Sequence, residues 1–224
     1  MVLAQPLQSH TRKTTEREVV IGPLRLAGNL RLPAAASALV VFAHGSGSSR
    51  LSPRNRMVAK ALNEQGIATL LFDLLTPDEE QDRANVFDIA LLAARLVDVV
   101  RWIDDQPTLA RFPLGLFGAS TGAAAALVAA AQLGRRVGAV VSRGGRPDLA
   151  DAALDKVTVP TLLVVGGRDT VVIELNEQAY ARLPAKKALE IVPSATHLFP
   201  EPGAMEAVIA LAGHWFRTYL IAAQ

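Results

Sequence analysis

The sequence predicts one α/β domain built around a mostly parallel β-sheet. Of its 224 residues, 50% are hydrophobic and 20% are charged, which supplies enough apolar material for a large core and argues against disorder. Short apolar runs recur along the chain, and helical stretches lie between them. Strands that alternate with helices in this way form parallel sheets covered by helices on both faces.

The predicted strands are distributed over most of the chain. We expect the polar residues 1–15 to form a flexible segment and residues 16–224 to form the domain. Glu16–Pro23 and Leu24–Pro33 predict two strands joined as a hairpin at Gly22-Pro23. The continuous apolar runs that follow predict buried parallel strands at Ala38–Ala43, Ile67–Phe72, Leu114–Phe117, Val137–Val141, Thr161–Val165 and Ala188–Val192.

The segments between these strands predict helices and one irregular stretch. From residue 87 to residue 105 the polar residues form a narrow stripe on an otherwise apolar helix, and Ala123–Leu133 predicts an alanine-rich helix. The interval from Val141 to Thr161 leaves room for one ordinary helix and for no cap domain. Residues 74–85 are polar and predict the one sizeable irregular segment near the strand ends.

Composition argues against several classes of function. The net charge is +2 and the basic residues are scattered, so no nucleic-acid partner is expected. Cysteine is absent and the four histidines lack metal-site spacing, so we expect no metal and no other cofactor. No apolar run reaches the roughly 18–20 residues of a membrane-spanning helix, and the first residues lack a signal-peptide pattern. We therefore expect a cytoplasmic protein with no membrane partner; the sequence does not indicate its oligomeric state.

A candidate nucleophile stands between a predicted strand and the alanine-rich helix, within Gly118-Ala119-Ser120-Thr121-Gly122. A serine at a tight strand-to-helix turn is held in a strained conformation with its Oγ exposed, and small residues on both sides let the backbone segments pass closely. Gly-x-Ser-x-Gly also occurs by chance, but the strand and helix around it favour a functional serine. Ser120 is the predicted nucleophile.

The base that activates such a serine is nearly always a histidine. His10 lies in the polar N-terminal segment, His44 precedes the nucleophile, and His214 lies within the last predicted helix. His197 follows the last predicted strand, where the chain order Ser, then Asp or Glu, then His places the base. We interpret His44 as structural, with its ring hydrogen-bonded to hold its turn.

The acid that orients the base is expected after a strand between Ser120 and His197. Asp169 follows the apolar run Thr161–Val165 in a glycine-rich turn, and Glu174 is its near rival. We expect the Ser120 hydroxyl within ~3 Å of one ring nitrogen of His197 and the Asp169 carboxylate near the other.

Two backbone N–H groups should stabilise the oxyanion that forms during acyl transfer. Thr121 supplies one because it follows the nucleophile. Ser46 is the predicted second donor, since the flanking glycines of His44-Gly45-Ser46-Gly47 allow its N–H to turn inward. A phosphate-binding loop is a weaker interpretation, because this turn lacks the Lys-Ser/Thr ending of a P-loop and the third glycine of a dinucleotide site.

Together these motifs resemble the α/β-hydrolase superfamily. They are His44-Gly45-Ser46-Gly47, Gly118-Ala119-Ser120-Thr121-Gly122, Gly167-Arg168-Asp169 and Thr196-His197, and the resemblance extends over roughly residues 16–222. The short chain most resembles the small dienelactone-hydrolase-like branch. The resemblance implies the α/β-hydrolase fold, with an eight-stranded sheet whose first strands are antiparallel, and an acyl-enzyme mechanism. Dienelactone hydrolase proper uses a cysteine nucleophile where this chain has serine, so lactone specificity is not implied.

These observations favour a serine esterase that acts on a small-molecule ester. Without a cap the site should be open and shallow, which suits short acyl groups. Arg50, Arg54 and Arg143 are candidate rim residues, and we select Arg50 and Arg143 as contacts for a carboxylate or phosphate of the substrate. Solvated or structural arginines are the alternative. Acyl transfer, lactone or thioester hydrolysis with the same triad, and a non-catalytic binding or regulatory module remain as other functions.

Overall fold

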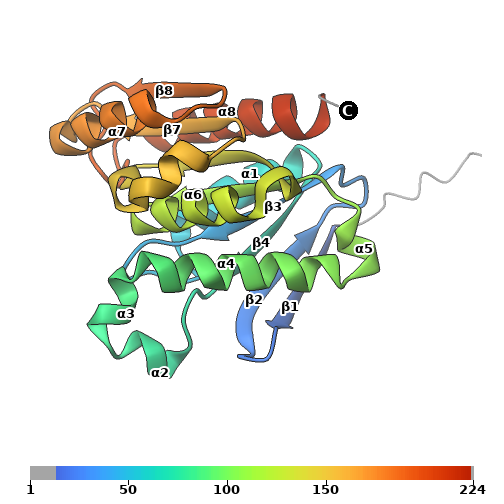
Figure 1. Cartoon of the computed structure of the whole chain (residues 1–224). Helices are drawn as coiled ribbons and strands as arrows, with labels where there is room; N and C mark the ends of the chain where they lie inside the picture. The colour runs from blue at the N-terminus through green and yellow to red at the C-terminus, as the bar shows by residue number, and fades with distance from the viewer. Residues whose placement is uncertain (1–13, 223–224) are drawn as a thin grey trace, which may run out of the picture.

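A computed structural model gives the structure of residues 14–222, which form one eight-stranded sheet in the order β1-β2-β4-β3-β5-β6-β7-β8 (Figure 1). β2 pairs antiparallel with β1 and β4, and all other pairs are parallel. This confirms the predicted hairpin and the mostly parallel sheet. The strands are β1 Thr15–Ile21, β2 Leu26–Leu32, β3 Ala38–Ala43, β4 Ile67–Phe72, β5 Leu114–Ala119, β6 Val137–Arg143, β7 Thr161–Gly166 and β8 Lys187–Val192. His10 lies outside the described residues, and so does the expected flexible segment except for residues 14 and 15.

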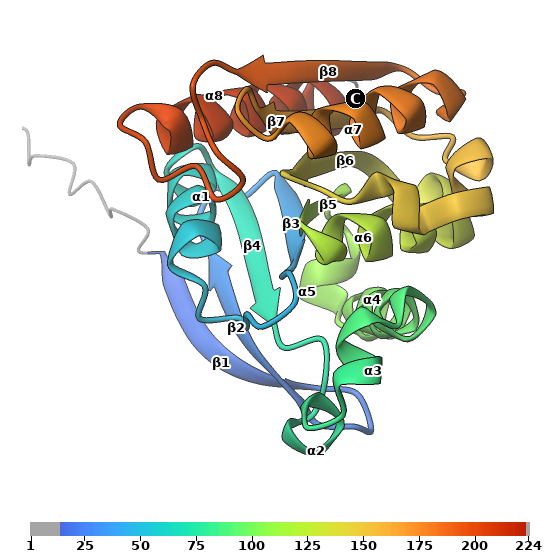
Figure 2. The ribbon, with the colours of Figure 1, turned by 90° about the vertical axis from the view of Figure 1, so that its left-hand side faces the viewer.

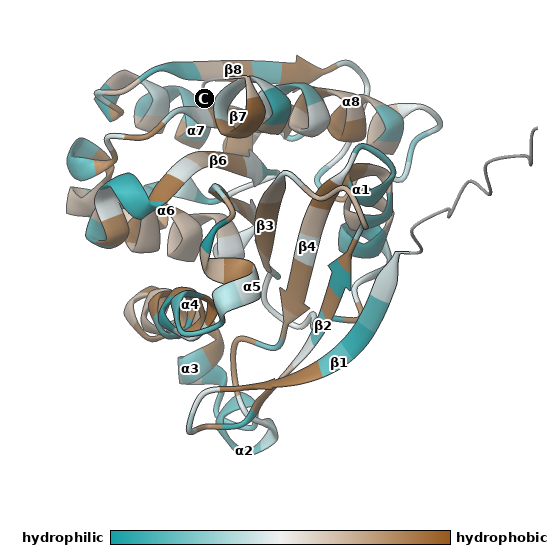
Figure 3. Ribbon diagram, turned by 90° about the vertical axis from the view of Figure 1, so that its right-hand side faces the viewer, coloured by the Kyte–Doolittle hydropathy of each residue, from teal (hydrophilic) through white to brown (hydrophobic). Residues whose placement is uncertain are grey.

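Helices cover both faces of the sheet. α1 and α8 pack on one face, and α4, α6 and α7 pack on the other, as Figure 2 shows for α1 against α4 and α6. The elements are α1 Pro53–Glu64, α4 Ile89–Asp104, α5 Pro107–Ala110, α6 Thr121–Leu133, η1 Gly134–Arg136, α7 Thr170–Arg182, α8 Ala204–Phe216 and η3 Arg217–Ile221. Every residue of β3, β4, β5 and β7 is buried, because these continuous apolar strands lie between two helical layers. Figure 3 shows β3 and most of β4 in hydrophobic colours and part of β1 in hydrophilic colours.

The helix predicted from residue 87 begins two residues later than expected. Asp88 is the N-cap of α4, and its side chain accepts a hydrogen bond from the Leu91 N–H at 2.9 Å. The sequence pattern counted Asp88 as a surface residue of the helix, because a cap residue and a surface residue are both polar. An N-cap of this kind stabilises a helix by about 1 kcal/mol relative to alanine.

The segment expected to be irregular instead forms two short helices, α2 Pro77–Glu80 and α3 Arg83–Phe87. Thr76 and Glu79 form a capping box at the start of α2. Glu79 also pairs with Arg95 of α4, whose side chain is 13% exposed. The capping box explains why the start of this segment is helical and not irregular. The ion pair holds this polar segment against α4.

The connection between β6 and β7 holds a 3₁₀ stretch, Pro147–Lys156 (η2), in place of the ordinary helix that was expected. Asp151 interrupts it with a φ of 41°. Residues 144–160 contain no further helix or strand. The prediction that no cap domain is inserted here is therefore confirmed.

His44 links the turns that follow β3 and β4. Its Nδ1 lies 3.0 Å from the Gly45 carbonyl oxygen, and its Nε2 accepts a hydrogen bond from the Leu74 N–H at 3.1 Å. Both bonds are satisfied by a neutral ring with its proton on Nδ1. Burial lowers the pKa of His44, against smaller raising effects of the Gly45 carbonyl and the Asp73 and Glu80 carboxylates. The predicted structural role of His44 is confirmed.

We predict that His44 makes the protein less stable in mild acid. In the unfolded chain it takes up a proton near pH 6.5, whereas the folded protein resists until its lowered pKa is reached. Stability should therefore fall as the pH drops from about 6.5 through the folded-state pKa, by at most ~1.4 kcal/mol per pH unit. Thermal unfolding between pH 8 and 5 measures this effect.

The His44→Gln variant should show a flatter pH profile than the wild type. His214→Gln is the matched control, because His214 is exposed on α8, and it should keep the wild-type slope. Equal slopes for wild type and His44→Gln would contradict the prediction.

Candidate active site

Ser120 occupies a strained turn between β5 and α6. Its φ of 51° and ψ of −121° place a non-glycine residue in a sparsely populated region, at a cost of about 1–3 kcal/mol. Neighbouring backbone enforces this geometry. A Cβ added at Gly118 would lie 2.4 Å from Ala123 Cα, and one at Gly122 would lie 2.4 Å from the Ala43 carbonyl oxygen. The predicted strand, turn and helix around Ser120 are confirmed, and α6 begins directly after it.

Asp169 and His197 meet at the carboxyl ends of β7 and β8. Asp169 Oδ2 lies 2.6 Å from His197 Nδ1, and the two side chains are 16% and 37% exposed. A short hydrogen bond to a carboxylate fixes the proton on Nδ1 and leaves Nε2 as an acceptor. The expected contact between these two residues is therefore present. Glu174, the rival acid, is exposed on α7.

The turns that carry these two residues are packed backbone to backbone. The Arg168 N–H donates to the Ala195 carbonyl oxygen at 2.9 Å. A Cβ at Gly166 would lie 2.5 Å from the same oxygen, so this close approach requires glycine. Glu201 accepts hydrogen bonds from both the N–H (3.1 Å) and the hydroxyl (2.7 Å) of Thr196. Glu201 holds the turn before His197 and was not anticipated, because no spacing in the sequence indicates this contact.

The end of β6 lies between the Ser120 turn and the imidazole ring of His197. The Ser120 N–H donates to the Arg143 carbonyl oxygen at 3.3 Å, and a Cβ at Gly144 would lie 3.7 Å from His197 Cε1. The expected hydrogen bond between Ser120 Oγ and His197 is not among the hydrogen bonds of residues 14–222. Catalytic hydrogen bonds are often long before substrate binds and shorten in the reactive complex.

One of the two predicted oxyanion donors already makes a hydrogen bond in this structure. Thr121 is the first residue of α6, where N–H groups have no acceptor within the helix. The Ser46 N–H, however, donates to Thr121 Oγ1 at 2.9 Å, so it is already engaged. The sequence places glycines beside Ser46 but does not indicate the rotamer of Thr121. Ser46 as second donor stays a prediction that requires the Thr121 side chain to rotate.

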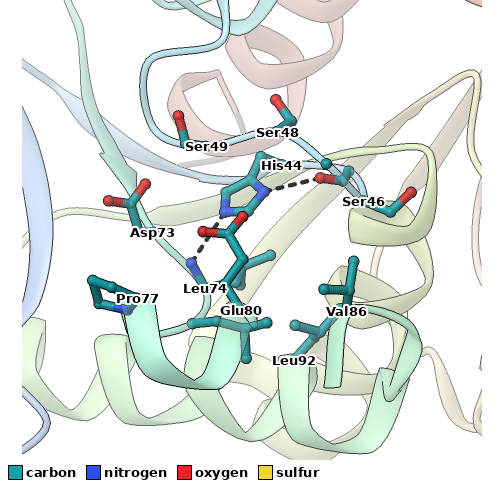
Figure 4. Close-up of a pocket in the computed structure, with 13 residues that line it drawn as sticks. His44, Ser46, Ser48, Ser49, Asp73, Leu74, Pro77, Glu80, Val86 and Leu92 are labelled. Atoms are coloured by element: carbon teal, nitrogen blue, oxygen red, sulfur yellow. Dashed lines mark hydrogen bonds between the residues drawn. The ribbon is translucent and has the colours of Figure 1, made fainter. Parts of the chain in front are cut away.

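A small pocket opens beside the nucleophile turn, between the turn after β3 and the α2–α3 segment (Figure 4). Its volume is about 80 Å³. Gly45 lines it, and a Cβ at Gly45 would lie 3.0 Å from Ser120 Cβ. Apolar side chains form the far wall, and the carboxylates of Asp73 and Glu80 also line it. The apolar residues are Leu74, Leu75, Val86 and Leu92. An open and shallow site stays a prediction, and on this side α2 and α3 bring these apolar side chains beside it.

The arginines expected at the rim differ in their surroundings. Arg50 donates from its backbone N–H (2.7 Å) and its guanidinium (2.5 Å) to Asp73, so its charge is already paired. Arg143 is not a rim residue, because it ends β6 and is only 6% exposed. Arg54 lies in the first turn of α1 and is partly buried. The predicted rim position is therefore wrong for Arg143, which is buried, whereas a substrate contact of Arg50 or Arg143 stays a prediction.

Within residues 14–222, no three His, Asp or Glu side chains gather in a way that could hold a metal ion. No helix in the same range is long and apolar enough to cross a membrane.

Comparison with known proteins places this fold in a family. Residues 36–208 match the family described as "Alpha/beta hydrolase domain". The crystal structure of a dienelactone hydrolase from Anabaena variabilis is 53% identical, with a TM-score of 0.89 over 94% of this chain and 100% of that one. Est1E from Butyrivibrio proteoclasticus shares the fold at 18% identity, with a TM-score of 0.76 over 92% of this chain and 99% of that one.

A curated relative differs in length and in name. A Mycobacterium tuberculosis protein named "Putative phosphoribosyl transferase" is 61% identical over 205 residues, which are 92% of this chain and 46% of that protein. The chain thus spans a little under half of the curated relatives it matches. The matching family, the strand order and the Anabaena structure agree on one assignment. This chain belongs to the α/β-hydrolase family, in its dienelactone-hydrolase-like branch.

Proposed function

We propose that this chain hydrolyses small carboxylic esters with short acyl groups through an acyl-enzyme formed on Ser120. The 2.6 Å pair of Asp169 and His197, at the same sheet edge as the strained Ser120 turn, is the observation that carries the proposal. A hydroxyl, an imidazole and a carboxylate in this order are the parts needed to activate a serine. No metal or organic cofactor takes part in the proposed reaction.

The proposed mechanism proceeds in two halves. His197 Nε2 takes the Ser120 hydroxyl proton while Oγ bonds to the ester carbonyl carbon, and the carbonyl oxygen becomes an oxyanion near the Thr121 N–H. The carbon–oxygen bond to the alcohol then breaks, and the alcohol leaves with the proton from His197. Water repeats the attack with His197 as base, which releases the carboxylic acid and restores Ser120.

The size of the pocket in Figure 4 supports short acyl groups. Its volume is only about 80 Å³, which suits an acyl chain of a few carbon atoms. We propose that the acyl group enters this pocket, and that the site is otherwise open enough for water to be the acceptor. Acyl transfer is the alternative use of the same triad. It requires a site that excludes water, so that another acceptor takes the acyl group. A small-molecule ester as partner and a cytoplasmic location complete the proposal.

The name of the curated relatives raises a second activity, phosphoribosyl transfer. This chain aligns with only 46% of their length. We propose that the named activity belongs to the part that this chain does not match, because the residues gathered around Ser120 are those of acyl transfer.

We predict that the triad substitutions abolish ester hydrolysis without unfolding the protein. Ser120→Ala should lower kcat for p-nitrophenyl acetate by several orders of magnitude. Asp169→Asn should lower it by about 10³–10⁴-fold, because the ring of His197 loses the partner that fixes its tautomer. Glu174→Gln is the matched control and should keep wild-type activity. An active Ser120→Ala variant would show that another group is the nucleophile.

The pocket also predicts the acyl-length profile. Each CH₂ that the pocket removes from water contributes roughly 0.8 kcal/mol, so kcat/KM should rise only while the chain still fits. We expect a maximum at acetate or butyrate and a decline by octanoate among p-nitrophenyl esters. Leu75→Ala should move the maximum toward longer chains by enlarging the pocket. A wild-type profile that still climbs at decanoate would contradict the short-acyl proposal.

A further inference from the structure

Two arginines near the Ser120 turn, Arg54 and Arg143, are at least partly buried and lack an ionic partner among the described residues. Arg143 is 6% exposed, and within residues 14–222 neither it nor Arg54 forms an ion pair or a side-chain hydrogen bond. The Nε atoms of both are buried without a hydrogen-bond partner. The arginines that do pair with carboxylates are Arg31, Arg50, Arg95, Arg101, Arg136, Arg146 and Arg182.

The electrostatics of this pair are unfavourable in the free protein. Burial, followed by the positive charge of Arg54, lowers the pKa of Arg143 to about 10. Arg143 therefore still carries its charge at neutral pH. A buried charge that lacks a counter-charge is destabilising, and a second cation nearby adds to the cost. An anion bound between the two guanidinium groups would remove both penalties.

The pair lies beside the catalytic machinery, on the face of the sheet that α1 and α8 cover. The Arg143 guanidinium carbon is 5.9 Å from the centre of the Phe199 ring, which belongs to the core under α1 and α8. The backbone of Arg143 accepts the Ser120 N–H, and a Cβ at Gly144 would contact both Phe199 and His197. Arg54 lies in the first turn of α1, where the helix dipole also favours an anion.

The pocket of Figure 4 borders the other hydrophobic core and carries acidic rather than basic side chains. It is lined by Leu92 of α4, from the other core, and by the carboxylates of Asp73 and Glu80. Because the charge of Asp73 is paired with Arg50, the exposed carboxylate of Glu80 is the one that disfavours an anion in that pocket, whereas the two arginines attract an anion. A substrate that spans Ser120 is thereby oriented, with its uncharged acyl group in the pocket and its charged end toward α1.

We propose that Arg54 and Arg143 bind a phosphate group on the alcohol part of the substrate, so that the preferred substrate is a short-chain ester of a phosphorylated alcohol. This inference rests on the proposed ester hydrolysis. Two guanidinium charges, that of Arg54 in the first turn of α1 and that of Arg143 at the end of β6, match a dianion, whereas a carboxylate would neutralise only one of them. Arg54, which is only partly buried, is the arginine that the phosphate meets first.

Binding can be tested without catalysis, with inorganic phosphate as the probe. Thermal unfolding is followed against phosphate concentration, with the ionic strength held constant by sodium chloride. The Tm of the wild type should rise and saturate, since a ligand that binds the folded state stabilises it. Arg54→Gln and Arg143→Met should lose this rise, and Arg56→Gln should keep it, because Arg56 is an exposed arginine of the same helix. A rise in Arg54→Gln equal to that in Arg56→Gln would overturn the proposal, and Arg54→Gln carries the test if Arg143→Met does not fold.

Kinetics then test the substrate class with three acetate esters: ethyl acetate, acetoxyethyl phosphate and acetoxypropanoate. The wild type should prefer the phosphate ester to ethyl acetate by at least about tenfold in kcat/KM, which corresponds to one good charged contact. Arg54→Gln should lose this preference, and Arg56→Gln should keep it. An equal or greater preference for the carboxylate ester would overturn the assignment to phosphate. Phosphate-dependent stabilisation without hydrolysis of any ester would refute the proposed function alone; hydrolysis with no phosphate effect would refute this inference alone.

Discussion

The backbone of the turn that carries Ser120 packs directly against the backbone of the turn after β3, and the geometry of the site depends on this contact. A Cβ at Gly122 would lie 2.4 Å from the carbonyl oxygens of both Ala43 and His44, and one at Gly45 would lie 3.1 Å from the Ala119 carbonyl oxygen. A side chain at Gly122 or Gly45 would therefore collide with or crowd the facing turn. The approach forces Ser120 into its strained conformation and brings Ser46 to Thr121.

Further contacts connect the turn after β3 to the elements that surround the site. His44 hydrogen-bonds this turn to the Leu74 amide after the end of β4. Arg50 binds Asp73 in that second turn, and the segment beyond it is fastened to α4 by the ion pair of Glu79 and Arg95. The wall of the small pocket is therefore held by polar contacts that begin at the nucleophile turn. This explains how a chain without a cap domain can still enclose one side of its site.

Much of the fold is predictable because continuous apolar strands, capped helices and glycine turns leave local patterns in the sequence. The motif around Ser120, the strand before Asp169 and the position of His197 are all local features. The burial of Arg143 is not local, because a strand buried on both faces gives no sign of which face its last residue takes. The pairing of Arg50 with Asp73 spans 23 positions, and the engagement of the Ser46 amide depends on one rotamer of Thr121. These contacts are set by tertiary packing, which periodicity cannot reveal.

The central claim is that Ser120 is a nucleophile activated by His197 and Asp169, and covalent labelling tests it most directly. Trypsin releases residues 112–135 as one peptide, in which Ser120 is the single serine. After reaction with a fluorophosphonate, mass spectrometry should find one adduct per chain, in this peptide and at Ser120, and His197→Ala should label far more slowly. An adduct on another peptide, or no adduct on a folded wild-type protein, would contradict the account.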